Sequence, residues 1–371
     1  MKRIPVTPRS DYREKIEALG FDFHGDYWRE EAYYRFTAEE TACLEEATNE
    51  AYRLYCEAAQ FIIEDNPEFM ERALNIPKEI GERIRASWDA DELSLYGRFD
   101  FILAKDGTPK ILEFNADTPL EASVIQWQWK EDVFPECDQF NGIHEGLVQS
   151  WKDIFPKKGE IHFAGALENN EDTGTLQYLA STAMEAGFST RVLDMQALDL
   201  QNGRFFDPAG ELVNRCFKLY PWEWMVDESP DGCLAEMEWL EPIWKLVMSN
   251  KAILATLYEL FPDSPYVLPC YLSRPRSGLF CKKPVFSREG HNVSVVDIRD
   301  WEEYVRIAET EGDYNTGTYV YQEYVEPTAY SGRYPVIGSW IIGGEAAGIG
   351  IRENRMEVTD NLSEFVPHII G

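Results

Sequence analysis

Basic residues are scarce in this sequence of 371 residues. Its 35 lysines and arginines stand against 66 aspartates and glutamates, which gives a formal net charge of −31 at pH 7. Nucleic-acid binding depends on basic surfaces that neutralise phosphates, and an anionic bilayer repels an acidic protein. No stretch approaches the 18 or so apolar residues of a membrane-spanning helix. We therefore expect neither nucleic acid nor a membrane as a partner.

Histidine ligand patterns and paired cysteines are also lacking. The seven cysteines are odd in number and form no C-x-x-C pair, and the start of the sequence has no apolar core of a secretory signal. We therefore expect reduced thiols and a cytoplasmic location. The five histidines show no zinc-ligand spacing, which disfavours a zinc enzyme.

Apolar residues, by contrast, are plentiful. Hydrophobic residues make up 44% and aromatic residues 13% of the chain, which is typical of a packed globular protein. Single cores stop growing near about 250–300 residues, so we expect two or three lobes. Helical and strand periodicities mix throughout and predict an α+β or α/β fold. The predicted segments are a helical scaffold with a β-hairpin over 1–155, a small α/β lobe over 156–240 and a strand-rich lobe over 241–371.

The most informative stretch is the predicted hairpin over 95–117, whose turn is centred on Asp106 and Gly107. This register places Asp100 opposite Glu113, and Arg98 opposite Asn115, all on one face. Phe99, Phe101, Leu112 and Phe114 are then expected on the other face. Two carboxylates about 5 Å apart repel by roughly 3 kcal/mol at an effective dielectric near 20, so something positive should neutralise them.

Two kinds of neutralisation remain open for this hairpin. Carboxylate and amide oxygens suit Mg²⁺ or Mn²⁺, which binds proteins through one or two carboxylates plus substrate phosphates. Alternatively, one carboxyl is protonated, or Arg98 and a lysine neutralise an ordinary polar sheet face. The residues that follow, Thr118 to Glu121, have the form of a capping box and predict a helix that starts directly after the strand.

A second group of polar residues lies in the last third. Lys251 at a helix start and Lys283 at a strand end are candidates for phosphate contacts, although surface lysines are routine at such positions. Gln322 and Glu323 in a strand could face an adenine and a ribose, and edge-strand solvation explains them equally well.

Two further residues are candidates on chemical grounds. Arg352 ends a strand and carries a fork that matches a phosphoryl or carboxylate group, while a salt bridge with Glu353 or another of the many acids is its ordinary role. Glu223 lies among aromatic residues, where it could hold an amine or simply form the polar edge of the cluster.

These motifs resemble the synthetase half of the glutathionylspermidine synthase family of ATP-grasp carbon–nitrogen ligases. The resemblance is carried, in order along the chain, by Arg98-Phe99-Asp100, Glu113-Phe114-Asn115-Ala116-Asp117, Asn250-Lys251, Lys283-Pro284 and Gly348-Ile349-Gly350-Ile351-Arg352. It covers nearly the whole chain, and the amidase half of bifunctional members has no counterpart. Thr118 to Glu121 depart from the small hydroxyl residues expected of members that use glutathione, so the chain looks closer to amidase-free members.

The resemblance implies an ATP-grasp-like fold with a small Rossmann-like lobe, and a role for each candidate residue. By resemblance, Asp100, Glu113 and Asn115 ligate Mg²⁺, with Mn²⁺ as a substitute and room for two ions. Lys251 and Lys283 contact the nucleotide phosphates, Gln322 and Glu323 lie by the adenine and ribose, Arg98 and Arg352 stabilise the charge of phosphoryl transfer, and Thr118 and Glu223 contact substrate.

The implied reaction is activation of a carboxylic acid or peptide by ATP to an acyl phosphate, followed by attack of an amine. A polyamine or basic amino compound is a candidate amine, because the acidic surface attracts it. Two alternatives stay open: a nucleotide-binding regulatory protein without ligase activity, and an enzyme that phosphorylates a small molecule or joins a thiol or hydroxyl.

Overall fold

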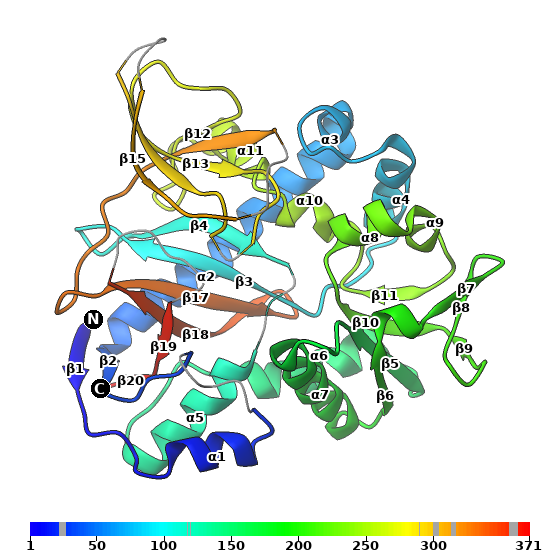
Figure 1. Cartoon of the computed structure of the whole chain (residues 1–371), viewed down its shortest axis with the longest axis horizontal. Helices are drawn as coiled ribbons and strands as arrows, with labels where there is room; N and C mark the ends of the chain where they lie inside the picture. The colour runs from blue at the N-terminus through cyan, green and yellow to red at the C-terminus, as the bar shows by residue number, and fades with distance from the viewer. Residues whose placement is uncertain are drawn as a thin grey trace.

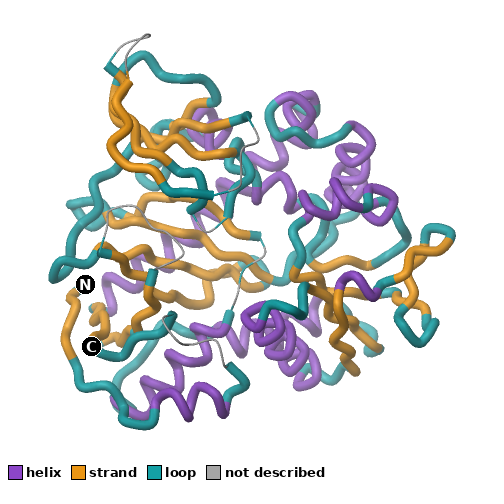
Figure 2. Tube along the Cα trace, viewed as in Figure 1, coloured by secondary structure: helices purple, strands orange, loops and turns teal. Residues whose placement is uncertain are grey.

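The computed structural model of the protein describes residues 1–21, 27–116, 118, 120–288, 290–299, 304–312, 317–355 and 363–371. These residues form a mixed α/β structure with several sheets (Figures 1 and 2), as the mixed periodicities predicted. Within them, no helix has the length and apolar character that crossing a membrane requires. All seven cysteines are free thiols, in agreement with their odd number and spacing.

A five-stranded antiparallel sheet lies at the centre of the molecule (Figure 1). Its strand order is β19-β18-β17-β3-β4. It joins the hairpin to strands from the end of the chain: β3 (Tyr96–Leu103), β4 (Pro109–Asn115), β17 (Tyr334–Ile342), β18 (Glu345–Asn354) and β19 (Glu364–Val366). Because β17 pairs with β3 and β18 pairs with β17, the C-terminal strands extend the sheet that the hairpin begins.

The hairpin has the predicted register near its open end. Arg98 pairs with Asn115, and Asp100 with Glu113. A bulge then shifts the register by one, so that Phe101 faces Ile111. The prediction that Leu112 shares a face with Phe99, Phe101 and Phe114 was therefore wrong: Ile111 is buried in its place, and Leu112 lines the cavity described below.

The long helix α2 (Ala38–Gln60) packs on one face of the central sheet (Figure 1) and continues into a π-helical turn, Phe61–Asp65. Thr37 caps this helix, because Thr37 Oγ1 accepts a hydrogen bond from the Glu40 N–H and the Glu40 carboxylate accepts one from the Thr37 N–H. Tyr55 meets Phe99 with ring centroids 5.1 Å apart. The apolar face of the hairpin therefore forms the core beneath α2, and its polar face points away.

A small parallel sheet forms a separate layer with the order β11-β10-β5-β6. Its strands are β5 (Glu160–Gly165), β6 (Ser189–Asp194), β10 (Arg215–Leu219) and β11 (Glu238–Leu240), and α7 (Asn170–Glu185) connects β5 to β6. This strand, helix, strand order matches the predicted α/β alternation. A meander of β7 (Asp199–Gln201), β8 (Arg204–Phe206) and β9 (Leu212–Val213) projects beside it, with a 3₁₀ turn, Met195–Ala197, before it (Figure 1).

A third sheet has the order β12-β16-β13-β14-β15. It consists of β12 (Cys270–Tyr271), β13 (Gly278–Pro284), β14 (Ser294–Ile298), β15 (Tyr304–Glu309) and β16 (Tyr319–Glu323). Helix α11 (Ile253–Leu260) packs against β12 and β16. The sheet lies alongside β4 (Figure 1), and a hydrogen bond from Gln322 Nε2 to the Ile111 carbonyl, 2.9 Å long, joins the two.

The remaining elements surround these three sheets. β1 (Lys2–Pro5), β2 (Ala32–Phe36) and β20 (His368–Ile370) form a sheet that brings the two termini close together (Figure 1). The other helices are α1 (Tyr12–Ala18), α3 (Glu68–Arg72), α4 (Lys78–Asp89), α5 (Glu121–Val133), α6 (Ile143–Ile154), α8 (Trp222–Glu228), α9 (Pro230–Cys233) and α10 (Lys245–Ser249).

The helix predicted to start at Thr118 begins later. Its N-cap is Leu120, which has no side-chain capping bond, so the prediction that Thr118 caps this helix was wrong. Asp117 and Pro119 of the predicted motif lie outside the described residues, as does the side chain of Glu121. Thr118 instead faces the polar side of the hairpin, where its contacts are set out next.

Candidate functional site

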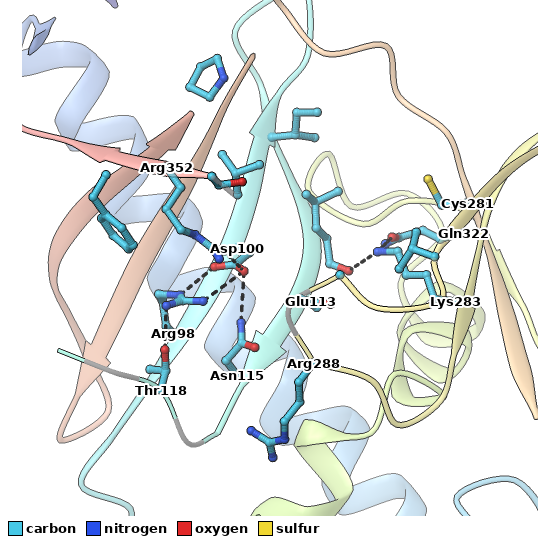
Figure 3. A pocket seen from close by; sticks show the side chains of 18 of the residues that line it. Arg98, Asp100, Glu113, Asn115, Thr118, Cys281, Lys283, Arg288, Gln322 and Arg352 are labelled. Carbon is cyan, nitrogen blue, oxygen red and sulfur yellow. Dashed lines mark hydrogen bonds and ion pairs between the residues drawn. The ribbon is translucent and has the colours of Figure 1, made fainter. Parts of the chain in front are cut away.

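A cavity of about 470 Å³ lies between the central sheet, the third sheet and the small parallel lobe (Figure 3). This volume is in the usual range for a small-molecule site. Nine of the eleven residues predicted from the sequence line it: Arg98, Asp100, Glu113, Asn115, Thr118, Lys283, Gln322, Glu323 and Arg352. The other two, Lys251 and Glu223, contact residues that line it.

Asp100 lies at the centre of the polar face of the hairpin (Figure 3) and is 4% exposed. Its Oδ1 accepts a hydrogen bond from Arg98 Nε at 2.8 Å. Its Oδ2 accepts from Arg352 Nη2 at 2.5 Å and from the Asn115 amide at 3.2 Å. Burial alone would raise the pKa of Asp100, but the charges of Arg352 and Arg98 outweigh it and lower this pKa.

Glu113 lies opposite Asp100 and has a different partner. Its Oε2 is 3.2 Å from Lys251 Nζ. Burial would raise the pKa of Glu113, yet the charges of Lys251 and Lys283 lower it overall. Positive side chains therefore neutralise both acids, which was one of the alternatives left open by the sequence. The sheet face is not an ordinary solvated one, because Arg98 and Asp100 are buried at the cavity wall.

The two lysines are buried rather than superficial. Lys251 is 7% and Lys283 is 6% exposed, which contradicts the surface-lysine alternative. Lys251 Nζ donates to the Ser287 carbonyl at 2.6 Å. Lys283 Nζ donates to the Leu112 carbonyl at 3.0 Å and to Gln322 Oε1 at 2.8 Å. The lysines thus reach the hairpin from the third sheet and the chain segment before it.

Gln322 does not lie on a solvated edge strand. It is 2% exposed, and β16 runs between β12 and β13, so the edge-strand alternative is wrong for this residue. Its side chain holds Lys283 and the Ile111 carbonyl, which fixes the lysine against β4. Its neighbour Glu323 lines the cavity.

Arg352 and Glu223 both form ion pairs at the site, and the acid that pairs with Arg352 is not its neighbour Glu353. Arg352 pairs with Asp100, whereas Glu353 pairs with Arg3 at 2.7 Å. Glu223 at the start of α8 accepts from Arg288 Nη2 at 2.9 Å. Arg288 belongs to the loop between β13 and β14 and lines the cavity, so this pair links the third sheet to the small lobe.

Two residues position the Arg98 guanidinium. Thr118 Oγ1 accepts a hydrogen bond from Arg98 Nη1 at 2.7 Å. Gly338 in β17 lies opposite Asp100, and a Cβ at this glycine would come within 2.8 Å of Arg98 Cδ. Sequence reasoning selected neither Gly338 nor Arg288. The only sequence signal for Arg288 was its place beside Gly290 in a loop that follows Lys283.

The hairpin supplies donors that suit a hard divalent cation. Among the described residues, no group of three His, Cys, Asp or Glu side chains could hold a metal ion. Asp100 and Glu113 nevertheless face the same cavity from opposed positions, with the Asn115 amide beside them. Two carboxylates and an amide fit Mg²⁺ when a ligand phosphate completes the coordination. The donor set therefore fits a metal that arrives with a phosphorylated ligand.

The lowered pKa values predict how stability depends on acid. A carboxyl group whose pKa is lower in the folded than in the unfolded protein stabilises the fold. This contribution is complete above the ordinary pKa, which is 3.8 for Asp100 and 4.5 for Glu113, and it is lost as pH falls through the lowered pKa. We expect Asp100→Asn to reduce the free energy of unfolding at neutral pH, and this difference to shrink below about pH 4. Urea unfolding of both proteins between about pH 6 and pH 3 measures it. A difference that is constant with pH would contradict the paired state of Asp100.

The fold and the cavity together define a mixed α/β protein whose site sets hard oxygen donors against lysines and arginines, an arrangement typical of binding metal-complexed phosphates. Residues 3–371 match the family described as glutathionylspermidine synthase preATP-grasp. The chain therefore belongs to the glutathionylspermidine synthase family, which confirms the resemblance drawn from its motifs.

Individual relatives bear names of ligases and synthetases. A Haemophilus influenzae protein provisionally named an acid–amine ligase is 34% identical, and the match covers 99% of each chain. Trypanothione synthetase of Crithidia fasciculata is 28% identical over 84% of this chain and 52% of its own length. The bifunctional glutathionylspermidine synthetase/amidase of Escherichia coli is 26% identical over 97% of this chain and 63% of its own. The chain thus spans less than two thirds of the latter two.

Proposed function

We propose that the protein is an ATP- and Mg²⁺-dependent carbon–nitrogen ligase that joins a carboxylic acid to an amine through an acyl phosphate. The observation that carries the proposal is one cavity lined by the opposed acids of the β3–β4 hairpin together with Lys283, Arg98 and Arg352, with Lys251 paired to Glu113 behind it. Family membership and the names of the relatives support the reaction class.

The placement of the side chains around one cavity supports the roles that the family resemblance implies. Asp100, Glu113 and Asn115 would hold Mg²⁺, which would neutralise charge on the transferring phosphate. Lys251 and Lys283 would bind phosphate oxygens, and the third sheet with Gln322 and Glu323 would hold the nucleoside. In this assignment the third sheet and the central sheet clasp the nucleotide as in an ATP-grasp fold, and the predicted segments 1–155, 156–240 and 241–371 correspond to its scaffold, preceding lobe and nucleotide lobe.

The arginines would act where charge develops. Arg98 and Arg352 converge on Asp100 from two strands. This supports a role for both guanidinium groups in stabilising the charge of phosphoryl transfer beside the proposed metal ligand. Cations held in a largely buried site stabilise such charge strongly, because little water screens their interaction with it. The acid would be a small carboxylate or a peptide, and the amine would approach from the side of Thr118 and Glu223.

A phosphate-release assay tests the proposal. With ATP and Mg²⁺, we expect phosphate only when a matching acid and amine are both present, and a product whose mass is the sum of the two minus water. Peptides with a free carboxylate, combined with polyamines and basic amino compounds, form the first panel. A product heavier by a phosphoryl group would instead indicate a kinase. Silence over the panel with ATP binding retained would favour a regulatory nucleotide-binding protein.

A further inference from the structure

Every predicted metal ligand at the site already has a partner within the protein. The two oxygens of Asp100 accept from Arg98, Arg352 and Asn115 (Figure 3). Glu113 is paired with Lys251. A divalent cation that entered alone would therefore have to displace guanidinium and ammonium groups from the carboxylates.

Such displacement is unfavourable without a second ligand. Arg352 and Lys251 would lose a charge partner in a largely buried site and would then face the metal as like charges. The other acids that line the cavity, Glu171, Asp172 and Glu323, belong to the start of α7 and the end of β16, not to the hairpin. Among the described residues, the acids that pair with Arg352 and Lys251 are Asp100 and Glu113.

A polyphosphate removes this obstacle, because its oxygens accept from the displaced cations. The structure contains unused donors for it. Among the described residues, the buried Arg352 Nε and Ser287 Oγ have no hydrogen-bond partner. The backbone carbonyl of the same residue, Ser287, accepts a hydrogen bond from Lys251 Nζ. Arg352 can therefore gain a partner when it moves from Asp100 to an anion.

We propose that the metal site is closed to free divalent cations in the unliganded protein, and that a polyphosphate opens it by drawing Arg352 and Lys251 away from Asp100 and Glu113. Arg352 and Lys251 then determine which form of the metal is accepted, in addition to any part in catalysis. The proposal rests on the proposed function in one respect, namely that the polyphosphate is that of a nucleotide.

Binding of Mn²⁺, followed by electron paramagnetic resonance at neutral pH, tests the order of binding without any measurement of turnover. We expect wild-type protein to bind free Mn²⁺ weakly and to bind it tightly once a non-hydrolysable ATP analogue is present. Arg352→Met removes one cation from Asp100, so free Mn²⁺ should bind about tenfold more tightly or better. Lys251→Met should act in the same direction through Glu113.

Two controls separate this site from the acidic surface. Arg53→Met removes an exposed arginine that pairs with Glu50 and Glu57, and it should leave Mn²⁺ binding unchanged. Adding Asp100→Asn to Arg352→Met should abolish the gain. Circular dichroism identifies a variant that does not fold, in which case the other methionine variant decides.

Two results would overturn the inference: wild-type protein that binds free Mn²⁺ as tightly as it does with the analogue, or methionine variants that show no gain. Failure of the proposed function has a different signature. In that case the wild-type protein would bind no ATP analogue, with or without metal, while the comparison of free Mn²⁺ affinities would still stand.

Discussion

Arg98→Lys is expected to lower turnover by about 10²–10³-fold while the affinity for ATP stays close to that of the wild type. Arginine presents a planar fork, and in this structure the fork holds Asp100 through Nε and Thr118 through Nη1. Lysine keeps the charge but cannot make both contacts from one position. Because Lys251 and Lys283 hold the phosphates in the proposed assignment, the loss should fall on the chemical step.

The measurement is kcat at saturating substrates together with direct titration of the nucleotide. Thr118→Val is a milder variant, because it removes only the acceptor of the Arg98 Nη1 hydrogen bond. It should lower kcat less than the change at Arg98 itself. Arg53→Lys, on the exposed face of α2, is the matched control. A variant at Arg98 that weakens ATP binding and keeps kcat would show that the arginine binds the ground state instead.

Lys245→Met is expected to lower the free energy of unfolding by about 3–5 kcal/mol, because it leaves a buried carboxylate without its cation. Glu241 and Lys245 are both 0% exposed and lie 3.0 Å apart. Glu241 also accepts from the N–H groups of Leu95 and Tyr96. Lys245 Nζ donates to the carbonyls of Tyr96 at 2.5 Å and Ala116 at 3.2 Å.

This pair holds the open end of the hairpin that carries the site, because Tyr96 begins β3 and Ala116 follows the end of β4. Chemical denaturation of Lys245→Met, Glu241→Gln and the double variant forms a complete cycle. The double variant should lose less stability than the sum of the single changes. A single change that costs less than about 1 kcal/mol would place the pair among weak surface salt bridges and contradict its burial.

The hairpin shows how far local sequence rules reach. Alternation of period two and a turn at Asp106-Gly107 predicted that Asp100 and Glu113 face each other, and they do. Next to the turn, however, the register differs by one from the predicted register, with Leu103 opposite Pro109, and the bulge restores the predicted pairing at Asp100. The bulge at Leu112 was not predictable in the same way. It accompanies the burial of Ile111 in the core and the hydrogen bond from the Ile111 N–H to the Tyr266 carbonyl, and a local sequence pattern shows neither.

The partners of the charged residues were decided at longer range. Alternation predicted a cation near the two acids, but it did not indicate which one. Arg352 on β18 reaches Asp100 on β3 across β17, which pairs with both strands. Lys251 reaches Glu113 from a segment that is hydrogen-bonded to Val285 and Ser287, just beyond the end of β13. Thr118 had the sequence pattern of a helix cap. In the structure its hydroxyl instead accepts a hydrogen bond from the buried Arg98.

The sequence by itself determined the acidic character, the mixed α/β class, the hairpin with its opposed carboxylates and, through its motifs, the family. These follow from composition, from periodicity and from contacts between residues close along the chain. Only the tertiary structure decided that the scarce cations Arg98, Lys251 and Lys283 are buried beside the hairpin, and that the half-buried Arg352 pairs with Asp100. Burial excludes water from unpaired charges, so each cation packs where an acid or a carbonyl can accept from it, and that choice depends on the whole fold.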